Sequence, residues 1–122
     1  LIKDYAFNIC RLDYRSSIMR YCDYLRKNSR NSWFSIEMAA REFHISGTQL
    51  RRVFKSELGV SPSEYLAALR IDMAKKLLLT RPDLPISAIA DDCGYSSVYY
   101  FSAAFRKAVR VTPSEFRREA LT

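Results

Sequence analysis

The residues best suited to chemistry in this sequence lie in two short stretches, one around Arg52 and one around Arg106. A guanidinium group carries N–H donors in a planar fork, which matches two acceptors on one edge of guanine or two oxygens of a phosphate. Threonine, glutamine, serine and tyrosine side chains stand beside these arginines and can contact other base edges or the backbone. This combination indicates recognition of a nucleic acid.

The sequence gives little support for a catalytic site. His44 is the one histidine, and no serine, cysteine or carboxylate is placed to partner it, so we interpret it as a turn residue. Asp91 and Asp92 are adjacent, and adjacent residues of a helix point about 100° apart, which favours a solvated surface over a paired site. We therefore expect no enzyme and no cofactor.

The candidate residues belong to a repeat. The stretch from Ile86 to Phe116 has a weaker copy from Ile36 to Tyr65. Most equivalent positions are 51 residues apart, namely Phe54/Phe105, Val60/Val111, Pro62/Pro113, Glu64/Glu115 and Tyr65/Phe116. Near the start of each copy the offset is 50, as in Ala40/Ala90 and Ser46/Ser96, so we place one extra residue after the turn of the second copy. A repeat of this length indicates one supersecondary unit used twice.

Apolar spacing and capping signals predict that helices form both copies. The expected helices are 16–28, Ile36–Phe43, a helix capped by Ser46 that runs to Leu58, Pro62–Thr80, Ile86–Cys93, Ser97–Val109 and one that begins near Pro113. Gly59 follows the third helix as a C-terminal glycine, and Ser61 with Glu64 has the spacing of a capping box. The long fourth helix carries an apolar stripe made of Tyr65, Leu66, Leu69, Met73, Leu77 and Leu78.

Two short helices joined by a tight turn, with a polar face on the second, describe a helix-turn-helix. In the third helix Leu50, Val53, Phe54 and Leu58 point inward, and Thr48, Arg52 and Lys55 point outward, flanked by Gln49 and Arg51. In the sixth helix Val98, Phe101, Phe105 and Val109 point inward, and Tyr99, Ala103 and Arg106 point outward, flanked by Ser102. Ser46, Ser96 and Ser97 are interpreted as caps whose helix ends offer amides to phosphate. Tyr100 is interpreted as a packing residue.

The run IADDCGYSSVYYFSAAFRKAVRVTPSEFR resembles the C-terminal signature of AraC/XylS transcription regulators. The upstream run FKSELGVSPSEYL, with Arg70 and Lys75–Leu78, is similar to the first helix-turn-helix and linker helix of that family. The resemblance covers roughly residues 17–120. It implies an all-α, homeodomain-like DNA-binding domain that binds double-stranded DNA and contacts RNA polymerase, most often as an activator. In larger family members an N-terminal domain binds an effector or mediates dimerisation. The resemblance therefore implies either that such a domain is missing from a chain that begins at Leu1 or that the chain is a small stand-alone regulator.

Two positions depart from the family pattern. Ala103 stands where the family often has arginine or another long polar residue, which weakens the expectation that the second unit reads bases. Arg110 stands where the family usually has glycine after the sixth helix. Either an arginine takes a left-handed conformation there, with a strain of roughly 1–2 kcal/mol, or the helix ends differently.

Composition agrees with a helical globular protein. The net charge is +7, from 20 basic and 13 acidic residues, and 48% of the residues are hydrophobic. No apolar run is long enough to span a membrane. Cys10, Cys22 and Cys93 are far apart and form no CxxC, so we expect neither a disulfide framework nor a metal site, but buried cysteines of a cytoplasmic protein.

We divide the chain into residues 1–15 as a connector or short helix, 16–65 as the first helix-turn-helix subdomain, 62–81 as the linker helix and 82–122 as the second subdomain. If the linker holds the two recognition helices about one DNA turn apart, near 34 Å, one chain reads successive major-groove segments. The alternative is a helical protein-interaction module that has lost DNA binding. The modest charge of residues 35–122, with 13 basic and 10 acidic side chains, leaves that alternative open.

Overall fold

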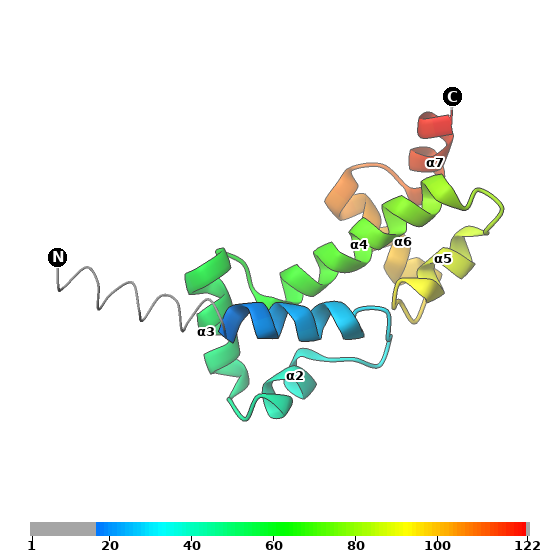
Figure 1. Cartoon of the computed structure of the whole chain (residues 1–122). Coiled ribbons are helices and arrows are strands. Elements are labelled where there is room, and N and C mark those ends of the chain that lie inside the picture. The colour runs from blue at the N-terminus through cyan, green and yellow to red at the C-terminus, as the bar shows by residue number, and fades with distance from the viewer. Residues whose placement is uncertain (1–16, 122) are drawn as a thin grey trace. The chain divides into compact units, whose positions relative to one another are not determined.

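The computed structural model describes residues 17–121, and within that range the chain forms seven helices and no strand (Figure 1). The first helix occupies residues 17–28. The others are α2 (Ile36–Glu42), α3 (Gly47–Leu58), α4 (Pro62–Thr80), α5 (Ile86–Asp92), α6 (Val98–Val109) and α7 (Pro113–Leu121). The predicted all-α fold is confirmed. The expected connector, residues 1–15, lies outside the described residues.

The helix ends differ from the predicted ones at three residues. Phe43 and Cys93 follow α2 and α5 as C-caps, with ψ near 7° and 6°, and do not belong to the helices. Ser97 has φ −149° and ψ 139°, an extended conformation, and therefore caps α6 from outside it. Ser35 and Ser46 cap α2 and α3 as expected.

The described residues divide into two compact units. The first contains residues 17–27 and Ser35–Tyr65, and the second contains Asn28–Phe34 and residues 66–121. Helix α4 is continuous, and its 19 residues give a length of about 28 Å. Its first turn belongs to the first unit and the remainder to the second.

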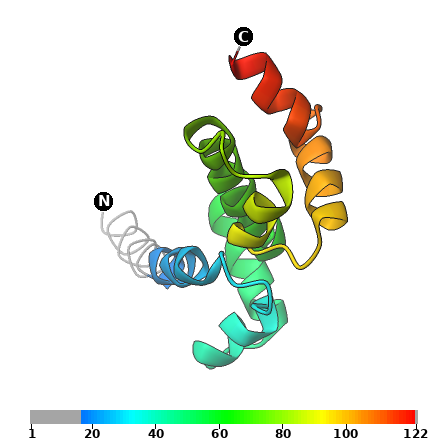
Figure 2. The same cartoon turned by 90° about the vertical axis from the view of Figure 1, so that its right-hand side faces the viewer.

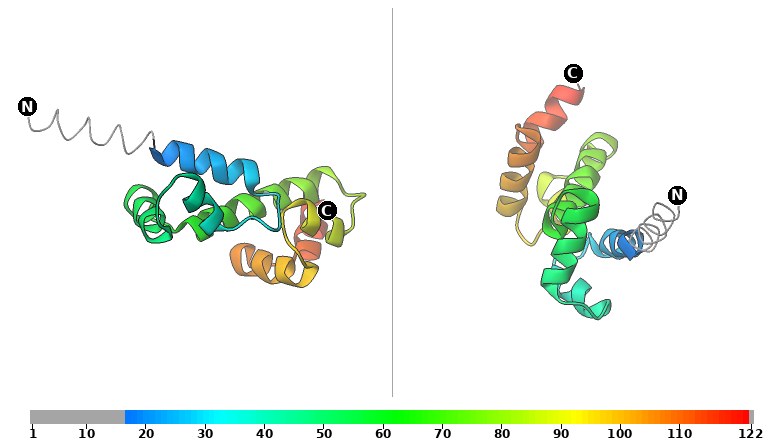
Figure 3. Two further views of the ribbon diagram at one scale, coloured as in Figure 1. Left: turned by 90° about the horizontal axis from the view of Figure 1, so that it is seen from below. Right: turned by 90° about the vertical axis from the view of Figure 1, so that its left-hand side faces the viewer.

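The first unit is built from the helix of residues 17–28, α2 and α3 (Figure 3). Its core contains Ile18, Leu25, Ile36, Ala39, Ala40, Leu50 and Phe54. The Phe43 ring lies 4.6 Å from Tyr21 and 5.3 Å from Tyr24 between ring centroids, in edge-to-face arrangements. Such pairs add to the stabilisation that burial alone provides.

The second unit places α5, α6 and α7 beside the C-terminal half of α4 (Figure 2). Its buried cluster contains Ile71, Ala74, Leu78, Ile89, Ala90, Cys93, Phe101 and Phe105. A chain of rings runs through it, because Phe101 contacts Tyr95 at 5.3 Å and Phe105 at 5.8 Å, and Phe105 contacts Phe116 at 5.5 Å. Burial raises the pKa of the Cys93 thiol to about 11, so it stays protonated at neutral pH.

The loop Asn28–Phe34 packs within the second unit through Arg70. The Arg70 guanidinium donates to the carbonyls of Ser29 at 2.8 Å and Asn31 at 3.0 Å and lies 5.7 Å from the Tyr95 ring centroid. Gly94 is buried against the same loop, where an added Cβ would collide with the Ser29 carbonyl oxygen. The loop therefore fits only a glycine at this position.

Arg117 closes the C-terminal end of α4. Its guanidinium donates to the carbonyls of Leu78 at 3.2 Å, Arg81 at 3.0 Å and Leu84 at 2.7 Å. A cation at this end is favoured because the last carbonyls of a helix lack partners within the helix and carry partial negative charge.

Two sequence interpretations of buried surface were wrong. Leu58 is 42% exposed, because it lies in the last turn of α3 and lines a pocket with Ile18, Met19 and Cys22 of the first helix. Helix α4 is buried on more than the predicted stripe, since Ile71 and Ala74 are 5% and 0% exposed. Ile71 and Ala74 join Leu78 in the buried cluster of the second unit, so this unit covers a wider arc of α4 than the predicted stripe.

Candidate nucleic-acid interface

A hydrogen-bonded turn joins α2 to α3 in the first unit. The Ile45 amide donates to the Ala40 carbonyl at 3.0 Å, and His44 between them has φ 56°, the left-handed conformation that ends many helices. His44 is exposed, as expected for a turn residue. The turn directs the chain into α3 within a few residues.

A complete capping box fixes the start of α3. The Gln49 amide donates to Ser46 Oγ, and the Ser46 amide donates to Gln49 Oε1, both at 3.0 Å. These bonds satisfy amides that have no partner within the helix. The side-chain oxygen of Gln49, which flanks the outward face, therefore accepts a hydrogen bond inside the protein. The Ser-x-x-Gln spacing of residues 46–49 is typical of a capping box and predicts this hydrogen bond.

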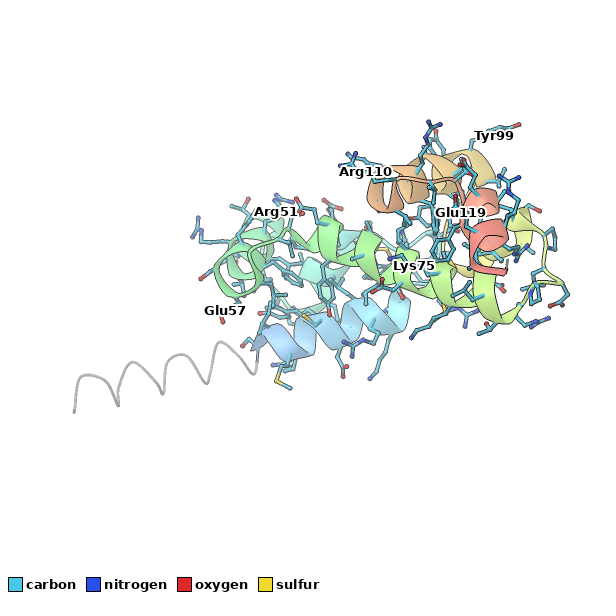
Figure 4. The ribbon with its side chains drawn as sticks, turned by 90° about the horizontal axis from the view of Figure 1, so that it is seen from above. Arg51, Glu57, Lys75, Tyr99, Arg110 and Glu119 are labelled. Atoms are coloured by element: carbon cyan, nitrogen blue, oxygen red, sulfur yellow. The ribbon has the colours of Figure 1, made fainter. Side chains whose placement is uncertain are left out.

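The outward face of α3 is open to solvent at the predicted residues. Thr48, Arg52 and Lys55 are exposed, and their side chains have no hydrogen bond or ion pair within the described residues. Arg51 is also exposed, and its guanidinium lies over Gly47, where an added Cβ would approach it at 3.4 Å. Figure 4 labels Arg51 among the side chains of α3. The face is thus free to bind another molecule through donors.

The turn between α5 and α6 repeats the first turn with one more residue. The Tyr95 amide donates to the Ala90 carbonyl at 3.0 Å, and Gly94 has φ 90°. Ser97 then accepts from the Tyr99 amide at 3.1 Å and caps α6. Ser96 is exposed and is not the cap, so the predicted pairing of Ser46 with Ser96 was wrong. The extra residue lies inside the turn, and Ser46 corresponds to Ser97.

The outward face of α6 is aromatic at its start and basic at its end. Tyr99 is 85% exposed, and Figure 4 shows its side chain extending away from the ribbon. Ala103 and Arg106 are exposed as predicted, whereas Ser102 is half-buried. Helix α6 contains two basic residues and no acidic one, so its field favours an anionic partner.

Tyr100 is a surface residue that the sequence interpretation missed. It is 71% exposed, which contradicts its assignment as a packing residue. With Ser97 equivalent to Ser46, Tyr100 is equivalent to Gln49, which flanks the outward face of α3. The 51-residue offset indicates an exposed position for Tyr100, but the spacing of the neighbouring aromatic residues is also typical of a helix core.

The described residues hold no group of three His, Cys, Asp or Glu side chains that could bind a metal ion. Among the helices of the described range, none is both long and apolar enough to cross a membrane. Cys22 is half-buried and Cys93 is buried, and both are free thiols. Cys10 lies outside the described residues.

Comparison with known proteins supports the assignment of both units to the helix-turn-helix class. Residues 39–119 match the family model described as a helix-turn-helix domain. The chain is 33% identical over 96 residues to the arabinose operon regulatory protein of Escherichia coli, covering 79% of this chain and 32% of that protein. It is 39% identical over 89 residues to the transcriptional activator RhaR of Pectobacterium carotovorum, covering 72% and 31%. The chain thus spans about a third of the length of these relatives.

The fold of this chain is also similar to that of a solved structure. The C-terminal domain of AraT, a response regulator from Geobacillus stearothermophilus, superimposes with a TM-score of 0.81 at 37% identity, covering 84% of each chain. The family match includes both turns and the helices α3 and α6 described above. The chain belongs to the AraC/XylS family of helix-turn-helix transcription regulators.

Proposed function

We propose that this chain binds specific sites in double-stranded DNA through α3 and α6. The observation that carries the proposal is the outward face of α3, where Thr48, Arg52 and Lys55 are exposed and have no side-chain partner within the described residues. A helix enters the major groove with its N-terminal residues at the base edges, and Thr48 and Arg52 lie in its first half.

The candidate residues divide by the contact they suit. Arg52 suits guanine O6 and N7, and Thr48 suits a thymine methyl group. Lys55 and Arg106 lie in the last turns of their helices and suit phosphates, which position the protein without specifying sequence. Arg51 suits a phosphate, and the amides at the helix ends capped by Ser46 and Ser97 can donate to one.

The test is the salt dependence of binding to duplex DNA. Each neutralised phosphate contributes a slope of about −0.9 in log K against log salt, so we expect steep weakening with salt for the proposed function. Lys55→Gln reduces the slope by about 1, whereas Lys76→Gln, which removes an exposed lysine of α4 outside both polar faces, leaves it unchanged. A flat dependence, or no binding at all, would favour the protein-interaction module.

Use of both units on one DNA is the second part of the proposal. Each unit supplies a helix of 12 residues with an exposed outward face, and both occur in one chain. We expect footprints over two successive major-groove segments on one side of the duplex. A footprint confined to one half-site of about 6 base pairs would contradict it.

The wider role follows the relatives' names. RhaR is a transcriptional activator, and we propose activation for the protein that contains this chain, with RNA polymerase as partner, in the cytoplasm. Because the chain spans about a third of its relatives, we also propose that a further domain binds an effector or mediates dimerisation. Reporter expression with and without the full-length protein tests activation, since repression would lower the signal.

A further inference from the structure

The start of α6 presents two adjacent tyrosines to solvent. Tyr99 and Tyr100 are 85% and 71% exposed, whereas the nearby rings of Tyr95, Phe101 and Phe105 contact one another inside the second unit. A tyrosine ring that becomes buried at an interface contributes a large contact area. Two such rings in the first turn of a recognition helix lie where base edges are contacted.

Ala103 continues this surface into the next turn. It is exposed and stands four residues after Tyr99 and three after Tyr100, so all three share one side of the helix. The equivalent position in α3 is Arg52. The second helix therefore offers a methyl group and two rings where the first offers a guanidinium fork.

The chemistry of the major groove identifies what such a surface can recognise. Guanine, adenine and cytosine present acceptors and donors there, and an alanine methyl can pair with none of them. Thymine presents a C5-methyl group, with which alanine and aromatic side chains make apolar contact. The tyrosine hydroxyls remain able to donate to phosphates beside the base.

We propose that α6 recognises thymine methyl groups through Ala103, Tyr99 and Tyr100, so that the DNA site is divided into a guanine-containing part read by α3 and a thymine-containing part read by α6. This inference rests on the proposed function. It assigns to Tyr100 a role in sequence specificity. It also means that Ala103 contacts a base, although it lacks the long polar side chain found at this position in many family members.

The experiment replaces thymine by deoxyuridine, which differs only by the missing methyl group. Bound duplexes are first selected from a random pool, and each thymine of the selected site is then replaced singly. Burial of one methyl group corresponds to roughly a fourfold change in affinity. We expect a loss of that size at one or two thymines in one half of the site, and no loss at thymines elsewhere.

Variants assign the effect to α6. Ala103→Gly abolishes the deoxyuridine sensitivity at the contacted thymine, whereas Ala108→Gly, which removes an exposed methyl group from the same helix, preserves it. Tyr99→Phe and Tyr100→Phe also preserve it, because they keep the ring. Circular dichroism confirms that each variant is folded under the binding conditions.

The outcomes separate the two levels of the proposal. Absence of any selected duplex overturns the proposed function itself. Selection of a site whose affinity is unchanged by deoxyuridine at every position overturns the inference alone and leaves DNA binding intact. Sensitivity that persists in Ala103→Gly and in the double variant Tyr99→Ala/Tyr100→Ala also overturns it, since another residue would then contact the methyl group.

Discussion

The two helix-turn-helix units repeat each other in their backbone and buried rings. The turn bonds Ile45–Ala40 and Tyr95–Ala90 are both 3.0 Å long. The residue after α3 has φ 75° and ψ 3°, and the residue after α6 has φ 76° and ψ 2°. The ring pairs Phe54–Tyr65 and Phe105–Phe116 have centroid distances of 5.7 and 5.5 Å.

The units differ in the side chains placed on this shared frame. His44 occupies the left-handed turn position of the first unit and is exposed, whereas Gly94 occupies that of the second and is buried. Gly59 follows α3 and Arg110 follows α6. On the outward faces Arg52 corresponds to Ala103. The comparison teaches that the two units share their backbone geometry and their buried rings, whereas the side chains at the turns and on the outward faces differ.

The largest expected effect tests the turns. Gly94→Ala places a Cβ against the Ser29 carbonyl oxygen and forces φ 90° on a residue with a side chain, so we expect a loss of about 3 kcal/mol or more in the free energy of unfolding. Gly59→Ala meets open space and costs only the conformational strain of about 1 kcal/mol. Urea denaturation measures both, and equal losses would mean that loop contact adds nothing at Gly94.

The next effect tests the outward faces. Arg52→Ala removes a bidentate guanine contact and is expected to lower discrimination at one base pair by about 1–3 kcal/mol, whereas Ala103→Ser changes discrimination less. Competition binding with sites substituted at single base pairs measures this. Equal losses from Arg52→Ala and Tyr99→Ala would show that both helices read bases with similar strength.

A smaller effect tests the helix ends. Arg110→Gly removes the cost of a side chain at φ 76°, so we expect the free energy of unfolding to rise by about 1 kcal/mol. Arg110→Ala is the matched control, because it removes the charge and keeps the Cβ. Thermal and urea denaturation distinguish them, and equal stabilisation by both variants would assign the effect to charge.

The smallest effect tests the caps. Gln49→Ala removes one of the two capping-box bonds and is expected to lower the free energy of unfolding by about 0.5 kcal/mol, with little change in base preference. Ser56→Ala, an exposed change in the same helix, serves as control. A change of preferred base without loss of stability would instead assign Gln49 to base reading.

Local sequence signals determined the helices and the fold. Apolar spacing and caps such as Ser35, Ser46 and Ser61 act within a few residues, so they can be read along the chain. The family resemblance left open whether Arg110 takes a left-handed conformation or the helix ends differently, and the structure has Arg110 at φ 76°. Most of the residues proposed to contact DNA are exposed, and their contacts with DNA stay predictions.

Tertiary contacts decided what the pattern could not. Arg70 and Arg117 bond to carbonyls 33 to 41 residues away, and Gly94 is fixed by a loop more than 60 residues earlier in the chain. The exposure of Tyr100 and Leu58 depends on which neighbours leave a face uncovered, and no local spacing records that. The sequence therefore determined the repeated frame, because caps and periodicity are local. The structure decided which rings and arginines serve the core and which remain for a partner, because burial depends on contacts distant in the sequence.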